Sequence, residues 1–377
     1  MRALLFVCIL FTSCNIKSNG EGNEKIDLLI GTYTDSGESE GIYVYTFDTD
    51  SGTLVYKNKV SGIDNPSYLT LSPDLSHVYA VSEWGRDSMG TVYAYNFDQQ
   101  TGQLTFINKQ SSGGSGPCYV STDLSGSYVY TANYGSGSLA AIPIESDGSL
   151  GSDIQEIYHK GNTVDGVEGP SRMHAAIVSP DQNFLFVTNL GTDKITSYPL
   201  NTSTETFPLD TTETKAISLE EGSGPRHFTF HPNGKYAYAI HELNGKITLF
   251  DYKDGRLTEK QQVNILPEGF RDKFAAADIH ISPDGKFLYG SNRLGLNEIV
   301  IFGIDPATGE LNFVGREASR GKTPRNFAID PSGKFLLVAN QDTNDIFVFE
   351  RNAETGLLTP TSEKITVGSP VCLKFVY

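Results

Sequence analysis

The sequence predicts an all-β protein, a single seven-bladed β-propeller with four antiparallel strands in each blade. Three observations lead to this prediction. A turn motif recurs about every fifty residues along the chain. Short strands rich in Val, Ile, Tyr and Phe follow each turn. The two ends of the chain each contain one part of a further unit, and radially repeated four-stranded sheets are typical of a propeller.

The repeat is anchored by a tight turn in which Pro presets φ and Asp, Asn or Gly tolerates the following positions. Six segments fit this turn: Ser72-Pro73-Asp74, Ser121-Thr122-Asp123, Ser179-Pro180-Asp181, His231-Pro232-Asn233, Ser282-Pro283-Asp284 and Asp330-Pro331-Ser332. Short strands such as 184–189 and 335–340 come next, followed by a third strand. A hairpin containing Thr-Gly or Ser-Gly then leads to a fourth strand, with Gly supplying positive φ.

The seventh blade is predicted to be shared by the two ends of the chain. Residues 28–33 match the second-strand pattern, but no first strand precedes them. Residues 370–377 resemble the first strand that begins at Pro66, and then the chain stops. Each end supplies what the other lacks, so N- and C-terminal strands together close the last blade and remove exposed sheet edges.

The first residues are predicted to direct export. Arg2 is followed by a short apolar run, and Thr12-Ser13-Cys14 resembles a lipoprotein cleavage site. We therefore expect a signal and tether over residues 1–25, a propeller domain over 26–377, and a lipid-anchored protein in the periplasm or outer membrane. Cys14 would be the only membrane attachment. An ordinary N-terminal extension would instead leave the protein in the cytoplasm.

Composition excludes several classes of function. The formal net charge is −16, whereas nucleic-acid binding needs a basic surface. A small anionic substrate in a locally basic pocket stays compatible with that charge. Outside the signal, Cys118 and Cys372 are expected to be buried free thiols. The sequence has no Gly-rich loop between a strand and a helix, no nucleophile elbow and no metal-spaced His pair, so we expect no cofactor and no metal.

Propeller geometry predicts where a site forms, because the start of the innermost strand and the end of the second strand emerge on the same face. The first position reads, blade by blade, Ser67, Pro117, His174, Arg226, Ala277 and Arg325. The second reads Tyr33-Thr34, Glu83-Trp84, Asn133-Tyr134, Asn189-Leu190, His241-Glu242, Asn292-Arg293 and Asn340-Gln341. The charged and imidazole members are concentrated in consecutive blades, so we expect them to meet near the axis.

Acyl chemistry on an anionic compound fits these residue types. Arg binds carboxylate or phosphate and stabilises an oxyanion, and Glu or His accepts a proton from water. The candidate catalytic residues are His174, Arg226, Glu242 and Arg293, and the candidate substrate-binding residues are Arg172, His227, His241 and Arg325. The competing interpretation is a polar lining of the central channel that holds water.

Four segments carry a resemblance to a known family: Gly169-Pro-Ser-Arg-Met-His174, Gly224-Pro-Arg-His227, Ala239-Ile-His-Glu-Leu243 and Tyr289-Gly-Ser-Asn-Arg293. From Ile26 onward the chain resembles the propeller lactonases, which include bacterial 6-phosphogluconolactonases and the fungal carboxy-muconate cycloisomerase. The resemblance implies an active site of His174, Arg226, Glu242 and Arg293 without a metal. The family commonly has Pro-His-Pro-His where this chain has only His174, preceded by Arg172-Met173.

Three functions follow as alternatives. The first is a lactonase that opens a sugar-acid lactone such as 6-phosphogluconolactone, a small anionic lactone, in carbohydrate metabolism. The second is a cycloisomerase-like, lactone-forming enzyme that uses the same residues. The third is a non-catalytic surface propeller that binds a glycan or a protein. Charge clustered at one mouth of the propeller favours an enzyme, whereas an exposed aromatic rim favours glycan binding.

Overall fold

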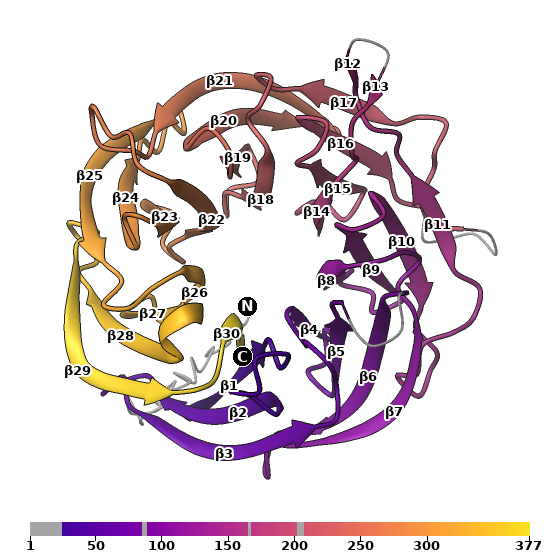
Figure 1. The fold of residues 1–377 in the computed structure, drawn as a ribbon, viewed down its shortest axis with the longest axis horizontal. Helices are drawn as coiled ribbons and strands as arrows, with labels where there is room; N and C mark the ends of the chain where they lie inside the picture. Colours follow the sequence, from indigo (N-terminus) through magenta and orange to yellow (C-terminus); the bar gives the residue numbers. More distant parts are fainter. Residues whose placement is uncertain (1–24, 85–88, 165–166, 202–206) are drawn as a thin grey trace, which may run out of the picture.

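The computed structural model describes residues 25–84, 89–164, 167–201 and 207–377. Within these ranges, seven four-stranded antiparallel sheets surround a central axis (Figure 1). The predicted seven-bladed, all-β fold is confirmed. The predicted signal, most of the tether and Cys14 lie outside the described residues, and the first strand begins at Lys25. No helix in the described ranges has the length and apolar character needed to cross a membrane.

Each blade is numbered in chain order, and its strands are given from the axis outwards. Blade 1 is β4 (Leu69–Leu71), β5 (His77–Ser82), β6 (Thr91–Asp98) and β7 (Gln103–Ser111); blade 2 is β8 (Pro117–Thr122), β9 (Tyr128–Asn133), β10 (Ser138–Pro143) and β11 (Gln155–Tyr158); blade 3 is β14 (Met173–Val178), β15 (Phe184–Asn189), β16 (Lys194–Pro199) and β17 (Lys215–Ser218); blade 4 is β18 (Pro225–Phe230), β19 (Tyr236–His241), β20 (Lys246–Lys253) and β21 (Arg256–Asn264).

The remaining elements complete the ring. Blade 5 is β22 (Phe274–Ile281), β23 (Phe287–Leu294), β24 (Glu298–Ile304) and β25 (Leu311–Ala318); blade 6 is β26 (Pro324–Ile329), β27 (Phe335–Asn340), β28 (Asp345–Arg351) and β29 (Leu358–Thr366); blade 7 is β30 (Pro370–Val376), β1 (Lys25–Thr32), β2 (Gly41–Asp48) and β3 (Leu54–Ser61). A short hairpin of β12 (Thr163–Val164) and β13 (Val167–Glu168) precedes blade 3, and the 3₁₀ helix η1 (Gln341–Thr343) follows β27.

Blade 7 joins the two ends of the chain as the sequence predicts. Strand β30 pairs antiparallel with β1, with Leu29 opposite Lys374 and Gly31 opposite Cys372. Figure 1 shows the yellow C-terminal strand beside the indigo N-terminal strands. A Cβ atom at Gly31 would lie 2.5 Å from the Pro66 carbonyl oxygen, so the closure requires glycine at this position. Cys372 in β30 and Cys118 in β8 are both buried free thiols, as predicted.

Buried tyrosines fasten neighbouring blades together and help to explain the abundance of this residue. Tyr79 in blade 1 donates its hydroxyl to the Gly148 carbonyl of blade 2 at 3.1 Å. Tyr238 and Tyr289 make the equivalent bonds from blades 4 and 5, to Gly309 at 2.7 Å and Gly356 at 2.8 Å. Each acceptor is a hairpin glycine of the following blade. The apolar body of each tyrosine packs in the core while its hydroxyl stays hydrogen-bonded.

Candidate active site

The innermost strands of blades 2 to 6 each carry a β-bulge near their first residues, and these bulges position His174, Arg226 and Arg325. The strand register shifts in β8, β14, β18, β22 and β26. The extra residues are Cys118, His174, Arg226, the pair Ala277 and Asp278, and Arg325. A bulge changes the direction of a side chain relative to regular pleating. The same local irregularity, repeated around the ring, therefore directs consecutive blades toward one place.

The centre of the site is a carboxylate between two guanidinium groups. Oε2 of Glu242 lies 2.9 Å from Nε of Arg226 and 3.1 Å from Nη2 of Arg293. The side chains of Arg226 and Arg293 are 2% and 10% exposed, whereas that of Glu242 is 22% exposed. Together with His174 and Arg325, we call these residues the axial cluster. The exposed part of Glu242 gives a ligand access to it.

Backbone carbonyls of blade 5 fix the two arginines. Arg226 donates from Nη1 to the Ala277 carbonyl at 2.6 Å. Arg293 donates from Nε to Ala275 and from Nη2 to Ala276, each at 3.3 Å. These carbonyls lie at or beside the bulge of β22, so both guanidiniums are anchored to the same piece of backbone. Their planar, multiply bonded donors are held in fixed directions, as oxyanion recognition requires.

The electrostatics of the cluster keep its carboxylate ionised. Burial raises the pKa of Glu242, but Arg293 and Arg226 outweigh burial and hold that pKa below its ordinary value. Burial lowers the pKa of Arg293 to about 9, which still leaves it protonated at neutral pH. Glu242 is therefore a weak base in this setting. Its charge compensates two buried cations that would otherwise be costly.

His174 differs from Glu242 in being uncharged at neutral pH. Burial, followed by the nearby charge of Arg226, lowers the pKa of His174 well below its ordinary value, so the imidazole is neutral at pH 7. Among the described residues its Nδ1 has no hydrogen-bond partner, although the atom is buried. The ring packs edge-on against Tyr134 and His227, with centroids 5.7 Å and 5.2 Å away. A neutral, buried imidazole with one nitrogen lacking a hydrogen-bond partner thus lies within the electrostatic influence of Arg226.

Glu83 and Tyr33, which the sequence places at the same mouth of the propeller but which are not among the candidate site residues, complete the cluster beside Arg325. The Arg325 guanidinium carbon lies 5.4 Å from the centre of the Tyr33 ring. Oε2 of Glu83 accepts hydrogen bonds from the Tyr33 hydroxyl at 2.9 Å and from the Ser67 hydroxyl at 2.5 Å. Glu83 is buried. Glu83 lies at the end of the second strand, where several other blades have Asn. This replacement of Asn by Glu was the sequence signal that could have identified Glu83 as a site residue.

Three predicted substrate-binding residues have other partners. His227 bonds through Nδ1 to Oδ1 of Asp278 at 2.6 Å, and burial lowers the pKa of His227 to about 4. His241 bonds through Nε2 to the hydroxyl of Thr248 at 3.1 Å, within blade 4. Arg172 donates to the carbonyls of Tyr134 and Gly135 at 3.2 Å and 3.0 Å. None of these bonds involves Glu242, the centre of the axial cluster.

Asp278, also not predicted from the sequence, joins His227 of blade 4 to Asn326 of blade 6. Its second oxygen accepts from Nε2 of His280 at 2.9 Å and from the Asn326 amide at 2.5 Å. Burial raises the pKa of Asp278, but His280 and His227 hold it well below its ordinary range. This buried carboxylate is satisfied by fixed donors, which indicates a structural role at the inner strands.

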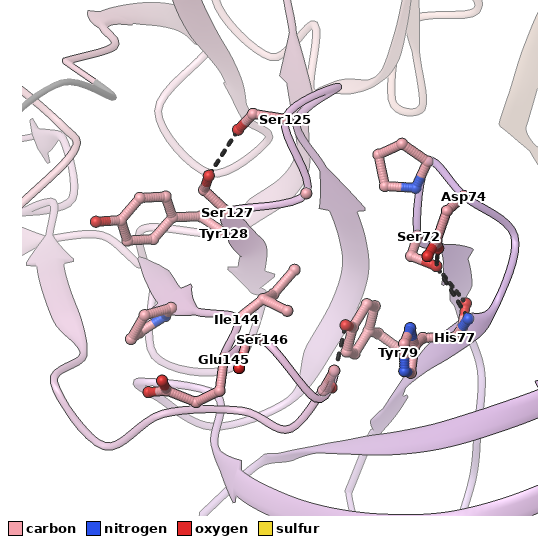
Figure 2. A pocket seen from close by; sticks show the side chains of 14 residues that line it. Ser72, Asp74, His77, Tyr79, Ser125, Ser127, Tyr128, Ile144, Glu145 and Ser146 are labelled. Carbon is pink, nitrogen blue, oxygen red and sulfur yellow. Dashed lines mark hydrogen bonds between the residues drawn. The ribbon is translucent and has the colours of Figure 1, made fainter.

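A cavity of about 510 Å³ lies between blades 1 and 2, on the face that carries the anchor turns (Figure 2). Its polar groups are used within the turns. Asp74 accepts hydrogen bonds from the hydroxyls of Ser72 and Ser76, which lower its pKa to about 2. Tyr79 donates to a backbone carbonyl. No pair of opposite charges converges there among the described residues, so the axial cluster is the better candidate for catalysis.

The axial cluster holds more guanidiniums than carboxylates, so its charge does not call for a metal cation. Over the described ranges, no three His, Cys, Asp or Glu side chains are grouped in a way that could hold an ion. The chemistry available is that of its own groups: two anchored guanidiniums, a carboxylate between them and a neutral imidazole. Such a set can bind an anion or stabilise a developing oxyanion while accepting a proton from water.

Comparisons with known proteins agree with this geometry. The family described as "Lactonase, 7-bladed beta-propeller" matches residues 27–375. A 6-phosphogluconolactonase of Formosa agariphila is 38% identical over 355 residues, covering 93% of this chain and 99% of the relative. The 6-phosphogluconolactonase of Bacillus subtilis is 36% identical over 350 residues, covering 92% and 97%.

Solved structures give the same result. A Bacteroides fragilis protein, solved as a candidate 6-phosphogluconolactonase, superimposes with a TM-score of 0.87 at 40% identity, covering 94% of this chain and 98% of the other. The periplasmic gluconolactonase of Pseudomonas aeruginosa gives a TM-score of 0.88 at 37% identity, covering 94% and 99%. With a family match over nearly the whole chain and relatives of this similarity, the chain belongs to the seven-bladed β-propeller lactonase family.

Proposed function

We propose that the axial cluster hydrolyses a sugar-acid lactone, making the protein a 6-phosphogluconolactonase-like carboxylic ester hydrolase. The observation that carries the proposal is the Glu242 carboxylate held at 2.9 Å and 3.1 Å between two buried arginines, beside a neutral histidine. The similar proteins named 6-phosphogluconolactonase and gluconolactonase support a lactone as the substrate.

The proposed reaction assigns a role to each group. His174 accepts a proton from water through an imidazole nitrogen, and the water oxygen attacks the lactone carbonyl. Arg226 and Arg293 stabilise the oxyanion that forms. The ring C–O bond then breaks, and the proton is returned to the departing alkoxide, giving the open hydroxy acid. Glu242 is a positioning residue that compensates and orients the two guanidiniums, because Oε2 of its carboxylate lies within 2.9 Å and 3.1 Å of their nitrogens.

A screen of lactone hydrolysis tests this function. Acid release is followed with glucono-δ-lactone and with 6-phosphogluconolactone, after subtraction of the spontaneous rate. We expect His174→Ala to lower kcat by about 10²–10⁴, the usual contribution of general base catalysis. Arg256→Ala, at an exposed position on the outer strand β21, is the control and should leave kcat unchanged. A wild-type protein that accelerates the opening of neither lactone would refute the proposal.

The other two functions become outcomes of the same screen. The relatives named above carry lactonase names, and none of them supports the cycloisomerase alternative. A non-catalytic glycan binder would bind sugars with the same affinity in wild type and in the His174 and Glu242 variants. The concentration of opposite charges at one face favours an enzyme over a binder.

We also propose export and lipid attachment at Cys14, on the basis of the apolar run that ends in Thr12-Ser13-Cys14. The experiment is membrane fractionation of wild type and Cys14→Ala. Wild type should sediment with membranes and the variant should not. Equal recovery of both proteins in the cytosol would contradict the proposal. A cytosolic protein would have access to phosphorylated metabolites as substrates.

A further inference from the structure

A second cavity, of about 480 Å³, opens on the same face as the axial cluster. It lies where the segments after β1, β5 and β27 meet, and its lining includes Tyr33, Asp35, Trp84, Gln341 and Asp342. We call it the Trp84 groove. Its volume falls within the range of small-molecule sites in proteins. The catalytic roles proposed above use none of the groups that line it.

Trp84 lines this groove in an unusual backbone conformation. The side chain is 56% exposed and the residue has φ of +53°, a left-handed conformation that costs free energy for any residue except glycine. Its indole N–H donates to Oε1 of Glu83 at 3.0 Å. A Cβ atom at Gly116 or Gly135 would lie within 2.8 Å or 2.9 Å of the ring, so only glycine lets the indole rest there. The chain thus maintains an exposed aromatic surface at a conformational cost.

The other groups of the groove select the chemistry of a ligand. Asp35, Glu38 and Asp342 contribute carboxylates, and Gln341 and Asn344 contribute amides. Carboxylate and amide oxygens accept hydrogen bonds from hydroxyl groups. An aromatic face packs well against the C–H face of a sugar ring. Three carboxylates would repel a phosphate or a carboxylate ligand. The combination is complementary to an uncharged, hydroxyl-rich ring.

The groove adjoins the axial cluster through two shared residues. Tyr33 lines the groove, and its ring faces the Arg325 guanidinium at 5.4 Å. Glu83 accepts from the Tyr33 hydroxyl on one oxygen and from the Trp84 indole on the other. A ligand that extends from the arginines past Tyr33 would therefore enter the groove. The two sites are neighbouring parts of one surface.

We propose that the Trp84 groove binds an uncharged sugar ring attached to the lactone, so that the substrate class is the lactone of an oxidised oligosaccharide. The lactone substrate class rests on the lactonase function proposed above, whereas binding of a sugar ring in the groove can be measured without catalysis. It assigns Trp84, Asp35 and Asp342 to substrate selection, and leaves the ester chemistry with the axial cluster.

Fluorescence provides a direct test, because Trp84 is the only tryptophan in the chain. Wild-type protein is titrated with cellobionate, maltobionate and gluconate, the stable open acids. We expect a saturable change in the Trp84 emission with one or both disaccharide acids and none with gluconate at the same concentrations. The double variant Asp35→Asn/Asp342→Asn, which keeps the fluorophore, should weaken binding of the disaccharide acid about tenfold, since two hydroxyl acceptors lose their charge.

The second arm measures selectivity. Trp84→Gly removes the indole at a backbone conformation that glycine accepts, so the fold is preserved. The ratio of kcat/KM for cellobionolactone or maltobionolactone to that for gluconolactone should fall about tenfold or more, as for truncation of a central aromatic contact. Asp254→Gly, at an exposed left-handed position in the β20–β21 turn, is the matched control and should leave the ratio unchanged.

The outcomes separate the groove from the proposed function. A fluorescence change with a disaccharide acid but no hydrolysis of any lactone would support the groove and refute the lactonase mechanism. Hydrolysis with no fluorescence response to either disaccharide acid would overturn the proposal that the groove binds a sugar ring and would leave the lactonase mechanism intact. A kcat/KM ratio that Trp84→Gly does not alter would have the same meaning. An equal response to gluconate would also overturn it, because the groove would then not distinguish the added ring.

Discussion

Glu242→Gln tests whether a single carboxylate holds the axial cluster together. The change keeps the size of the side chain and removes its charge, which leaves Arg226 and Arg293 without their shared partner. At separations near 3 Å and an effective dielectric constant of about 20, each pair has a gross attraction of about 5 kcal/mol. Loss of one partner from a buried pair costs about 3–5 kcal/mol. Because the Glu242 side chain is 22% exposed, we expect the lower end, about 3 kcal/mol.

The assay has a stability arm and a kinetic arm. Urea unfolding at pH 7 gives the change in the free energy of unfolding, and initial rates on the best lactone give kcat and KM. We expect kcat to fall about 10²–10³-fold, as for loss of an organised oxyanion donor. Glu298→Gln is the control. Glu298 pairs with Arg316 at 2.5 Å away from the axis, so its neutralisation should also destabilise the fold by breaking a largely buried pair, but it should leave kcat unchanged.

The pH profile of the hydrolysis rate distinguishes a positioning role for Glu242 from a general base role. If neutral His174 accepts the proton, the rate stays constant as the pH falls from 8 to below 6, because its pKa lies well below the ordinary value. Glu242→Gln should then lower the whole profile without changing its shape. An unfolding free energy within about 0.5 kcal/mol of wild type would refute the bridging role. Loss of the acidic limb in this variant would refute the assignment of the proton acceptor to His174.

Three further predictions concern acid stability, oxyanion binding and ring closure. Burial lowers the pKa of His227 and His241 to about 4, so each neutral histidine contributes stability that is complete above the unfolded pKa near 6.5 and is lost as the pH falls. By linkage, the two histidines together should lower the free energy of unfolding by about 4 kcal/mol between pH 7 and pH 5. His241→Gln should remove half of this loss, as measured by urea unfolding at the two pH values. Arg226→Lys should lower kcat about a hundredfold, because lysine cannot contact Glu242 and the carbonyl of Ala277 together; a rise in KM alone would contradict the oxyanion role. Deletion of residues 370–377 should expose β1 and cause aggregation on size exclusion, and a soluble, cooperatively unfolding truncation would contradict closure.

The blades and their closure could be predicted because each blade is a local unit of sequence. The anchor turns recur with regular spacing, and the two incomplete ends match the missing strands of one blade, as the pairing of β30 with β1 confirms. The predicted group of Arg226, Glu242 and Arg293 follows from the same regularity. Glu242 and Arg293 lie at the ends of the second strands of blades 4 and 5, and Arg226 lies at the start of the innermost strand of blade 4; a propeller brings these positions together on one face near its axis.

The details that sequence reasoning missed arise from irregular backbone and from ring closure. In blade 2 the bulge residue is Cys118, one position after the expected Pro117, and in blade 5 the bulge includes Asp278 as well as Ala277. A bulge shifts the register by one residue without a clear sequence signal. Tyr33 meets Glu83 only because blade 7 closes beside blade 1, across 50 residues of chain. No local pattern contains that contact.

The surplus positive charge of the site stabilises an oxyanion that forms during the reaction. Three guanidiniums, of Arg226, Arg293 and Arg325, stand with two carboxylates, of Glu83 and Glu242, so the cluster carries one surplus positive charge. The whole chain carries a formal charge of −16, which slows the long-range approach of a phosphorylated lactone but does not prevent its binding at this locally positive site. A neutral lactone meets no such barrier, and it develops its negative charge only when water has added to the carbonyl. The surplus cation then interacts more strongly with the transition state than with the bound substrate, and only that difference accelerates the reaction.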